Sequence, residues 1–391
     1  MKKYNYIVVG GGMSADAAVK GIREVDLTGK ILMVSSENNT PYDRPPLSKS
    51  LWKGKSIESI WRNTEEQDVE IILGKRITSI NPKEKTITDA KNSEYGYEKL
   101  LIATGAETRK LPYEPEGILY YRSIEDYKKL RSLAEKKNKF AVIGTGFIGS
   151  EISAALAMNN NDVTVIDIGA GIGWKIFPAE ITEYLNNYFR ERKVTVITNI
   201  EVTDIHQSSQ SVQVKTSSGL EVDVDAVIAG VGVIPNTILA ENANLEVGNG
   251  ICVNEYLQTS NPDIFAAGDV ANFYNPLLDQ RIRIEHANNA DSMGRQAGRN
   301  MAGAGEKFDY LPYFFSDLFD LGYEAVGLMD SRWEIVEDWQ EKFKKGVLYY
   351  LEGNRVRGVI LWNIWDKLDV AREIIGIPAP VYKADIIGKI K

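Results

Sequence analysis

Cysteine is almost absent from this chain, since Cys252 is the only one in 391 residues. A single cysteine allows no internal disulfide, no redox-active cysteine pair and no cysteine-ligated iron–sulfur cluster. Cys252 lies in an apolar run that reads as a strand, and we expect a buried structural thiol there. Histidine is nearly as scarce, because His206 and His286 are the only two and stand in no metal-ligand spacing. We therefore expect neither thiol chemistry nor a metal site.

Excess positive charge and long hydrophobic runs are also missing. The formal net charge of -8 argues against a nucleic-acid partner held through its phosphates. No apolar stretch approaches the roughly 20 residues that span a bilayer, which argues against membrane insertion. The first residues run directly into an apolar strand rather than a signal peptide, so we expect a cytoplasmic protein. The length of 391 residues predicts two or three domains.

Two glycine-rich motifs of the same kind are the most informative feature that is present. Each follows a short apolar strand (6–9 and 140–143) and opens a helix-compatible run (15–23 and 150–158). In such a motif the first glycine permits the tight turn, and the second lets the backbone approach a pyrophosphate at the helix N-terminus. The sequence therefore predicts two dinucleotide-binding units. The predicted contacts are Gly10, Gly12, Ser14 and Ala15 in the first motif, and Gly144, Gly146, Phe147, Ile148 and Gly149 in the second.

An acidic residue closes the strand that follows each motif. Strand 31–35 runs into Ser36 and Glu37, and strand 162–166 runs into Asp167. A carboxylate about 20 residues past such a motif can accept a hydrogen bond from a ribose hydroxyl. For Glu37 a solvated loop acid is the alternative. No basic residue follows Asp167 before Lys175, so no cation stands close by to receive the 2′-phosphate of NADPH. The carboxylate and this lack of a cation favour NADH over NADPH.

The order of elements predicts an α/β fold with an internal repeat. We expect a first dinucleotide-binding domain over 1–122 and 243–308, a second over 123–242, and a C-terminal α+β domain over 309–391. Segments 70–73, 77–80 and 85–88 predict a small antiparallel layer, and a strand near 263–267 is expected to return to the first sheet. In the last domain, a hairpin is predicted from 347–351 and 356–361, with a helix over 366–375.

Several further segments carry a resemblance to a known family. Residues 41–49, 103–105, 230–235 and 268–269, together with both glycine motifs, resemble those of flavoprotein pyridine-nucleotide oxidoreductases. Segment 41–49 is similar to two branches, the ferredoxin-reductase components of bacterial dioxygenases and apoptosis-inducing factor. Segments 146–151, 173–178, 285–286 and 361–364 are closer to the second branch. The resemblance implies two Rossmann-like domains in a glutathione-reductase-like arrangement, with FAD in the first and NAD(H) in the second.

The resemblance also implies roles for individual residues. Arg44 would meet the FAD phosphates and Asp269 the flavin ribityl chain, with Thr104 and Gly105 against the cofactor. Phe315 departs from the Trp that relatives often have before a Ser-Asp pair. Trp362 would either cover the flavin face or pack in the core. The cofactor contacts implied in addition are Ser36, Gly232, Gly268, Glu285, His286 and Ala287.

Lys49 and Glu151 are the residues that we expect at the reaction centre. Hydride transfer needs positioning and electrostatic tuning, which a cation and a carboxylate can supply. A solvated lysine and a first-turn helix acid are the ordinary alternatives. The resemblance implies NADH oxidation through FAD, with electrons passed to a ferredoxin, rubredoxin or Rieske-type carrier. Alternatives are a redox-responsive flavoprotein with NADH-linked dimerisation, and an NADH oxidase or quinone reductase.

Overall fold

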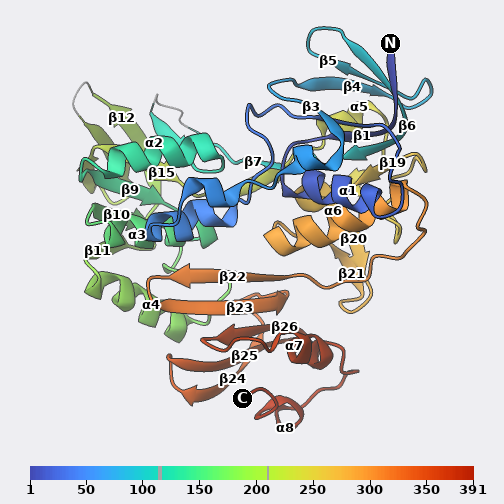
Figure 1. Ribbon diagram of the computed structural model, residues 1–391. Coiled ribbons are helices and arrows are strands. Elements are labelled where there is room, and N and C mark those ends of the chain that lie inside the picture. The colour runs from blue at the N-terminus through green and yellow to red at the C-terminus, as the bar shows by residue number, and fades with distance from the viewer. Residues whose placement is uncertain (113–116, 209–210) are drawn as a thin grey trace. The chain divides into compact units, whose positions relative to one another are not determined.

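The computed structural model describes residues 1–112, 117–208 and 211–391 (Figure 1). The chain forms two compact units. Unit 1 comprises residues 1–44, 56–107 and 234–313, and unit 2 comprises residues 45–55, 108–233 and 314–391. The chain passes between them at β7 (Ala106–Thr108) and β16 (Val233–Pro235), among other places.

Unit 1 is built on one large sheet with the strand order β3-β2-β1-β6-β5-β4, to which β19 is added beside β6. Its centre is fully apolar, and Ile7 and Val8 are completely buried. Strand β2 pairs parallel with both β1 and β3, and β6 pairs parallel with both β1 and β19. A parallel sheet of this kind is the arrangement of a nucleotide-binding domain. The strands are β1 (Lys2–Val9), β2 (Ile31–Val34), β3 (Val69–Ile72), β4 (Ile77–Asn81), β5 (Thr86–Asp89), β6 (Glu94–Ile102) and β19 (Ile264–Ala266).

The return of β19 to the first sheet is confirmed, whereas the predicted antiparallel layer is only partly present. β4 and β5 pair antiparallel, but β5 continues onto β6 in the same sheet. β3, expected in that layer, instead pairs parallel with β2 at the sheet edge. An edge strand is half exposed, so its sequence alternates like that of an antiparallel strand, and pattern alone does not separate the two.

Two helices of unit 1 lie side by side, α1 (Met13–Arg23) and α6 (Ala287–Met301), as Figure 1 shows. Glycines of α6 allow this approach, because a Cβ added at Gly294 would lie 2.3 Å from the carbonyl oxygen of Ser14. At Gly298 it would lie 2.0 Å from the carbonyl oxygen of Ala18. The remaining elements of the unit are η3 (Ile57–Ile60), η4 (Thr64–Gln67), α5 (Ile238–Asn242), β17 (Val247–Gly248), β18 (Gly250–Cys252), η5 (Gly268–Val270), β20 (Ala271–Asn275) and β21 (Gln280–Ile282).

Unit 2 repeats the strand–turn–helix–strand arrangement in a five-stranded sheet with the order β11-β10-β9-β15-β8. All the pairings in this sheet are parallel, and helices follow three of its strands. The predicted internal repeat is thus confirmed. The elements are β8 (Ile118–Tyr120), α2 (Ile124–Ala134), β9 (Lys139–Ile143), α3 (Phe147–Met158), β10 (Asp162–Ile166), α4 (Ala179–Glu191), β11 (Val194–Ile197) and β15 (Ala226–Ala229), with a separate sheet of β12 (Val202–Gln207), β13 (Val212–Thr216) and β14 (Glu221–Val224).

The C-terminal part of unit 2 is a second five-stranded sheet, with the order β22-β23-β26-β25-β24. The predicted hairpin is present as β25 and β26, and the predicted last helix as α7, which begins two residues later than expected. The elements are β22 (Tyr313–Leu318), β23 (Leu321–Gly327), β24 (Glu334–Glu341), β25 (Lys345–Glu352), β26 (Arg355–Trp362), α7 (Leu368–Ile375) and α8 (Lys383–Ile386).

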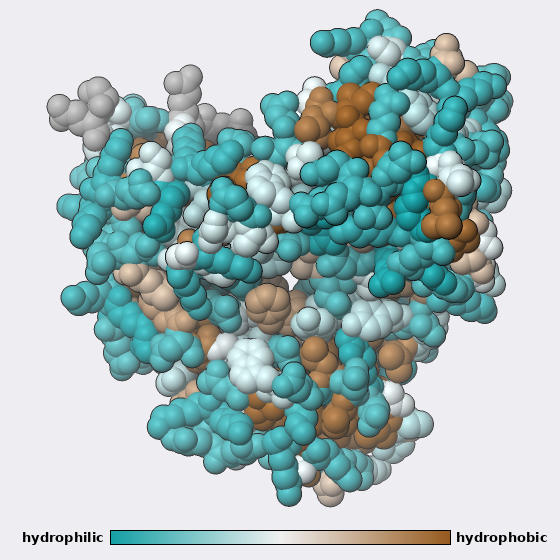
Figure 2. All heavy atoms as spheres, viewed as in Figure 1, coloured by the Kyte–Doolittle hydropathy of each residue, from teal (hydrophilic) through white to brown (hydrophobic). Residues whose placement is uncertain are grey.

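Segment 45–55 belongs to unit 2. It forms η1 (Pro45–Ser48) and η2 (Ser50–Lys53), and the carbonyl oxygen of Leu47 accepts hydrogen bonds from Trp52 and Tyr121. The three-domain division stays a prediction. None of the helices in the described ranges is both long and apolar enough to cross a membrane. Hydrophilic side chains predominate on the face drawn in Figure 2, with separate hydrophobic areas between them.

Candidate active site

The first glycine motif of unit 1 forms a turn whose glycines have distinct requirements. Gly10 has φ +137°, and a Cβ there would lie 2.1 Å from the carbonyl oxygen of Ala103. Gly12 has an ordinary extended conformation, and a Cβ there would meet only Arg44 Nη2, at 4.0 Å. The Oγ of Ser14 is buried and has no hydrogen-bond partner among the described residues. Open space, an unpaired hydroxyl and the N-terminus of α1 together fit a dinucleotide pyrophosphate.

Arg44 is held near this motif by two neighbours. Its guanidinium forms an ion pair with Glu37 and lies 5.1 Å from the ring centroid of Tyr42. The Tyr42 hydroxyl donates to Glu37 Oε2 at 2.7 Å. Burial lowers the pKa of Arg44, but Tyr42, Glu37 and Asp269 raise it above its ordinary value, so the side chain stays positive. Glu37 thus orients Arg44, the residue predicted to bind the FAD phosphates. The predicted contact of Glu37 with a ribose stays a prediction.

Other predicted residues of unit 1 lie at the ends of its strands. Gly268 has φ +79°, and a Cβ there would lie 2.9 Å from Cβ of Ser14, so η5 approaches the glycine motif closely. Thr104 donates its hydroxyl to the carbonyl oxygen of Asn236 at 2.9 Å. The structure places the rest as follows: Ser36 is exposed after β2, Gly105 has φ +65°, Asp269 lies in η5, Glu285 pairs with Arg283, His286 is the N-cap of α6, and Ala287 begins that helix.

The second glycine motif, in unit 2, repeats this division of roles. Gly144 has φ +94°, and a Cβ at Gly149 would lie 2.0 Å from the carbonyl oxygen of Gly144. At Gly146 a Cβ would have nothing within 4 Å. Phe147 and Ile148, which begin α3, are 39% and 40% exposed. The turn therefore leaves space and apolar side chains available to a ligand. Gly232, with φ +101°, is similarly open.

Asp167 has a role in this turn that the sequence did not indicate. Its Oδ2 accepts hydrogen bonds from the backbone N–H and the hydroxyl of Thr145, both at 2.6 Å. Its Oδ1 accepts from the N–H of Gly169, also at 2.6 Å. The side chain is buried at 7% exposure. Asp167 therefore fixes the middle of the glycine motif, and its expected contact with a ribose stays a prediction.

Lys49 and Glu151 lie together within unit 2. Lys49 Nζ is 2.8 Å from Glu151 Oε2, and the lysine side chain is 11% exposed. The other donors are hydroxyls: Ser48 donates to Oε2 at 2.6 Å and Ser316 to Oε1 at 2.7 Å. Glu151 is 3% exposed and belongs to the first turns of α3. The carboxylate is thus fully engaged and holds one cation in a fixed position.

Two aromatic side chains lie near this ion pair. The ring centroid of Phe315 lies 5.0 Å from Lys49 Nζ, which is a cation–π distance, and Phe315 is 39% exposed. Tyr323 is buried, and its ring contacts that of Phe314 at a centroid distance of 6.2 Å. Burial, together with the charge of Glu151, raises the pKa of Tyr323, although the neighbouring Ser316 acts in the opposite direction. Stacking of Phe315 on a flavin stays a prediction.

Comparison with known proteins assigns the fold and the cofactors. Residues 4–294 match the profile of the family described as pyridine nucleotide-disulphide oxidoreductase. The chain belongs to this family. Residues 335–376 also match the C-terminal domain described as apoptosis-inducing factor, mitochondrion-associated. A pyridine nucleotide-disulphide oxidoreductase uses FAD and NAD(H), and the two glycine motifs described above fit these dinucleotides.

Three relatives illustrate the range of the family. Apoptosis-inducing factor 1 of Dictyostelium discoideum is 31% identical, over 96% of this chain and 79% of its own length. Putidaredoxin reductase CamA of Pseudomonas putida is 30% identical, over 96% of this chain and 93% of its own length. The reductase in a covalent putidaredoxin reductase–putidaredoxin complex has a TM-score of 0.90 at 30% identity, over 96% of this chain and 94% of that one.

Trp362 packs among other aromatic side chains of unit 2. It is fully buried within the last sheet, stacked on Tyr323 with ring centroids 6.0 Å apart and edge-on to Phe177 at 5.4 Å. Its Nε1 donates to the carbonyl oxygen of Phe343 at 2.9 Å. Neighbouring aromatic rings thus enclose the indole, which favours the core-packing alternative, and a flavin cover stays a prediction.

We expect Trp362→Ala to lower the free energy of unfolding by about 3–5 kcal/mol, because it empties a large site in an aromatic core. The visible absorption and circular dichroism of bound FAD should stay those of the wild type. Urea unfolding and the flavin spectrum measure the two effects separately. A changed flavin spectrum in a stably folded variant would contradict the core role.

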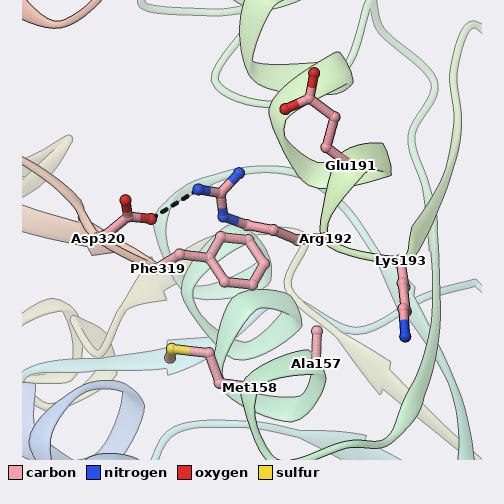
Figure 3. Close-up of a pocket in the computed structure, with 7 residues that line it drawn as sticks. All are labelled: Ala157, Met158, Glu191, Arg192, Lys193, Phe319 and Asp320. Carbon is pink, nitrogen blue, oxygen red and sulfur yellow. Dashed lines mark hydrogen bonds and ion pairs between the residues drawn. The ribbon is translucent and has the colours of Figure 1, made fainter.

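The pocket drawn in Figure 3 contains none of the predicted residues. It is an open cavity of about 450 Å³ where the ends of α3 and α4 meet the β22–β23 turn. Arg192 pairs there with Asp320 at 2.9 Å and lies 3.5 Å from the ring centroid of Tyr188. These contacts stabilise the turn and do not add to the predicted site.

Sequence reasoning missed the residues that act through others. Ser48 lies inside the segment that carries the resemblance, and Ser316 belongs to the noted Ser-Asp pair, yet neither had a role assigned. Thr145, inside the second motif, was also passed over. The only indication of a role was their position in a motif, next to a residue predicted to bind a cofactor. Their hydrogen-bond partners are far away in sequence and gave no further indication.

Proposed function

We propose that this oxidoreductase takes electrons from NADH and passes them through FAD to a small iron–sulfur carrier such as a ferredoxin, rubredoxin or Rieske-type protein. The buried Lys49–Glu151 pair, with the two serine donors, is the observation that carries the proposal. Similarity to putidaredoxin reductase over nearly the whole chain supports a carrier as acceptor. The only cysteine, Cys252, is buried in β18, so disulfide reduction is not proposed.

The residues have separate tasks in this proposal. In unit 1, Gly12, Ser14 and Arg44 would hold the FAD pyrophosphate, with Asp269 at the sugar chain. In unit 2, Gly146 and the N-terminus of α3 would hold the pyrophosphate of NADH. When bound, FAD would accept a hydride and release its electrons one at a time.

Lys49 and Glu151 would contribute electrostatics rather than proton transfer. Glu151 keeps the Lys49 ammonium in one place, and the serine hydroxyls stop the carboxylate from rotating. A preorganised cation costs no rearrangement when negative charge develops nearby. Low exposure of both side chains strengthens the effect, because water does not screen the charges.

We also propose a preference for NADH, with Asp167 as its source. NADPH would bring a 2′-phosphate toward this carboxylate, and like charges facing each other cost several kcal/mol. We expect kcat/KM for NADH to exceed that for NADPH by about 100-fold. Steady-state rates with each nucleotide measure the ratio, and equal values would contradict this role of Asp167.

Anaerobic stopped-flow reduction of the FAD-loaded protein by NADH tests the function. We expect fast bleaching of the flavin, then rapid reoxidation on addition of a ferredoxin but slow reoxidation by oxygen. A panel of ferredoxin, rubredoxin and Rieske-type proteins covers the carrier classes. No stimulation by any of them would contradict the proposal.

A redox-responsive role is the second candidate, favoured by the match of residues 335–376 to the apoptosis-inducing-factor domain. It predicts slow reduction, a long-wavelength charge-transfer band that survives air, and dimerisation on adding NADH. Rapid oxygen consumption would instead indicate an NADH oxidase, and rapid quinone reduction a quinone reductase. A cytoplasmic location remains part of the main proposal.

A further inference from the structure

Arg62 joins three separate segments of unit 1 through its guanidinium. Nε, Nη1 and Nη2 contact Asp16 Oδ2, Asp43 Oδ1 and Asp291 Oδ1 respectively, each at 2.6 Å. Asp16 lies in the first turn of α1, Asp43 directly precedes Arg44, and Asp291 belongs to α6. The arginine side chain is 13% exposed. One side chain thus connects the two packed helices to the segment that carries a predicted phosphate ligand.

The charges around Arg62 are nearly balanced. Lys20 Nζ lies 3.0 Å from Asp16 Oδ2, and Thr64 donates its hydroxyl to Asp16 Oδ1 at 2.7 Å. Three carboxylates therefore face two cations. Burial lowers the pKa of Arg62, but the carboxylates of Asp291, Asp16 and Asp43 raise it above its ordinary value. The guanidinium therefore stays charged, and each of its three nitrogen atoms donates a hydrogen bond to a carboxylate.

The backbone beside Arg62 fastens the segment before Arg44. The N–H of Asp43 donates to the carbonyl oxygen of Ile60 at 2.8 Å, and the N–H of Arg62 donates to that of Pro41 at 3.1 Å. Between them Tyr42 pairs with Trp61, with ring centroids 6.0 Å apart. Residues 41–43 therefore form a short ribbon with 60–62.

We propose that Arg62 is a positioning residue for FAD, acting without contact with the cofactor. It keeps Arg44 beside the first glycine motif, where Nη2 lies 4.0 Å from the Cβ position of Gly12. It also compensates Asp16, whose buried carboxylate in the first turn of α1 would otherwise repel a pyrophosphate at that helix N-terminus. This inference rests on the proposed binding of FAD to unit 1.

The two half-exposed partners of Arg62 offer a matched pair of variants. Asp43→Asn and Asp291→Asn each remove one carboxylate, and the two side chains are 43% and 42% exposed. Only Asp43 lies on the segment that carries Arg44. A merely structural role predicts equal effects of the two variants on stability and on FAD release.

The measurement is the rate of FAD release from the holoenzyme after dilution, followed by flavin fluorescence. We expect Asp43→Asn to speed release about tenfold or more, and Asp291→Asn by less than about threefold, at similar midpoints of thermal unfolding. The circular dichroism of bound flavin should change in Asp43→Asn alone. In an Arg44→Gln background, Asp43→Asn should add less than about twofold, because its effect passes through Arg44.

Equal rates of FAD release from the two variants would overturn the inference while the proposed function stands. The same holds if Asp43→Asn speeds FAD release as much in the Arg44→Gln background as in the wild type. A wild-type protein that neither contains nor takes up FAD would overturn both. Arg62→Lys extends the series, since a lysine keeps the charge but cannot contact three carboxylates at once. It should release FAD at a rate between those of the wild type and Arg62→Met.

Discussion

Glu151→Gln is expected to slow the reduction of bound FAD by NADH about 100-fold, the scale measured when one preorganised electrostatic group is removed from an active site. The amide has the shape of the carboxylate but no charge, so Lys49 loses the partner at 2.8 Å that fixes its ammonium. One of the two serines, Ser48 or Ser316, keeps a carbonyl oxygen to donate to, while the hydroxyl of the other can accept from the amide N–H, so the local packing persists. FAD content should stay at the wild-type level, because the residue lies in unit 2 and the predicted contacts with the FAD pyrophosphate and sugar chain lie in unit 1.

The same unit offers a control for this variant. Glu180 pairs with Lys342 on the surface, with side chains 60% and 54% exposed. An exposed ion pair contributes about 0–1 kcal/mol, so Glu180→Gln should leave both the reduction rate and the stability unchanged. Anaerobic stopped-flow absorbance at saturating NADH compares the three proteins. A wild-type rate in Glu151→Gln would remove Glu151 from the reaction centre.

The glycine motifs show which parts of the site are predictable from the sequence. Gly10 and Gly144 are needed for a turn within a few residues, so the sequence pattern contains the whole physical reason. The parallel strands on either side follow from the same local pattern. Both dinucleotide-binding folds could therefore be predicted before the structure was known.

Contacts across long sequence separations were not predictable in this way. Ser316 lies 165 residues from Glu151, and nothing near either residue indicates the hydrogen bond between them. Arg62 and Asp291 are 229 residues apart and meet only because α1 packs on α6. The surroundings of Trp362 were not predictable for the same reason, since the rings that enclose it come from other strands and from the segment before α4.

Gly146→Ala and Gly149→Ala are expected to separate nucleotide binding from folding within one motif. A Cβ at Gly146 has nothing within 4 Å, and the residue's φ of -68° suits alanine, so the variant should fold as the wild type does. The added methyl group would occupy the space predicted for the NADH pyrophosphate. Because overpacking costs about 1–3 kcal/mol, the Kd of NADH should rise about 10- to 100-fold.

Gly149→Ala should have the opposite profile. Its Cβ would lie 2.0 Å from the carbonyl oxygen of Gly144, and backbone on both sides must move to make room. We expect a loss of about 3 kcal/mol or more in the free energy of unfolding, from the separation of α3 and β9. Thermal unfolding and NADH titration of the FAD-loaded variants measure the two effects. Unchanged NADH affinity in a folded Gly146→Ala protein would show that this turn does not hold the pyrophosphate, because the methyl group has no other neighbour to disturb.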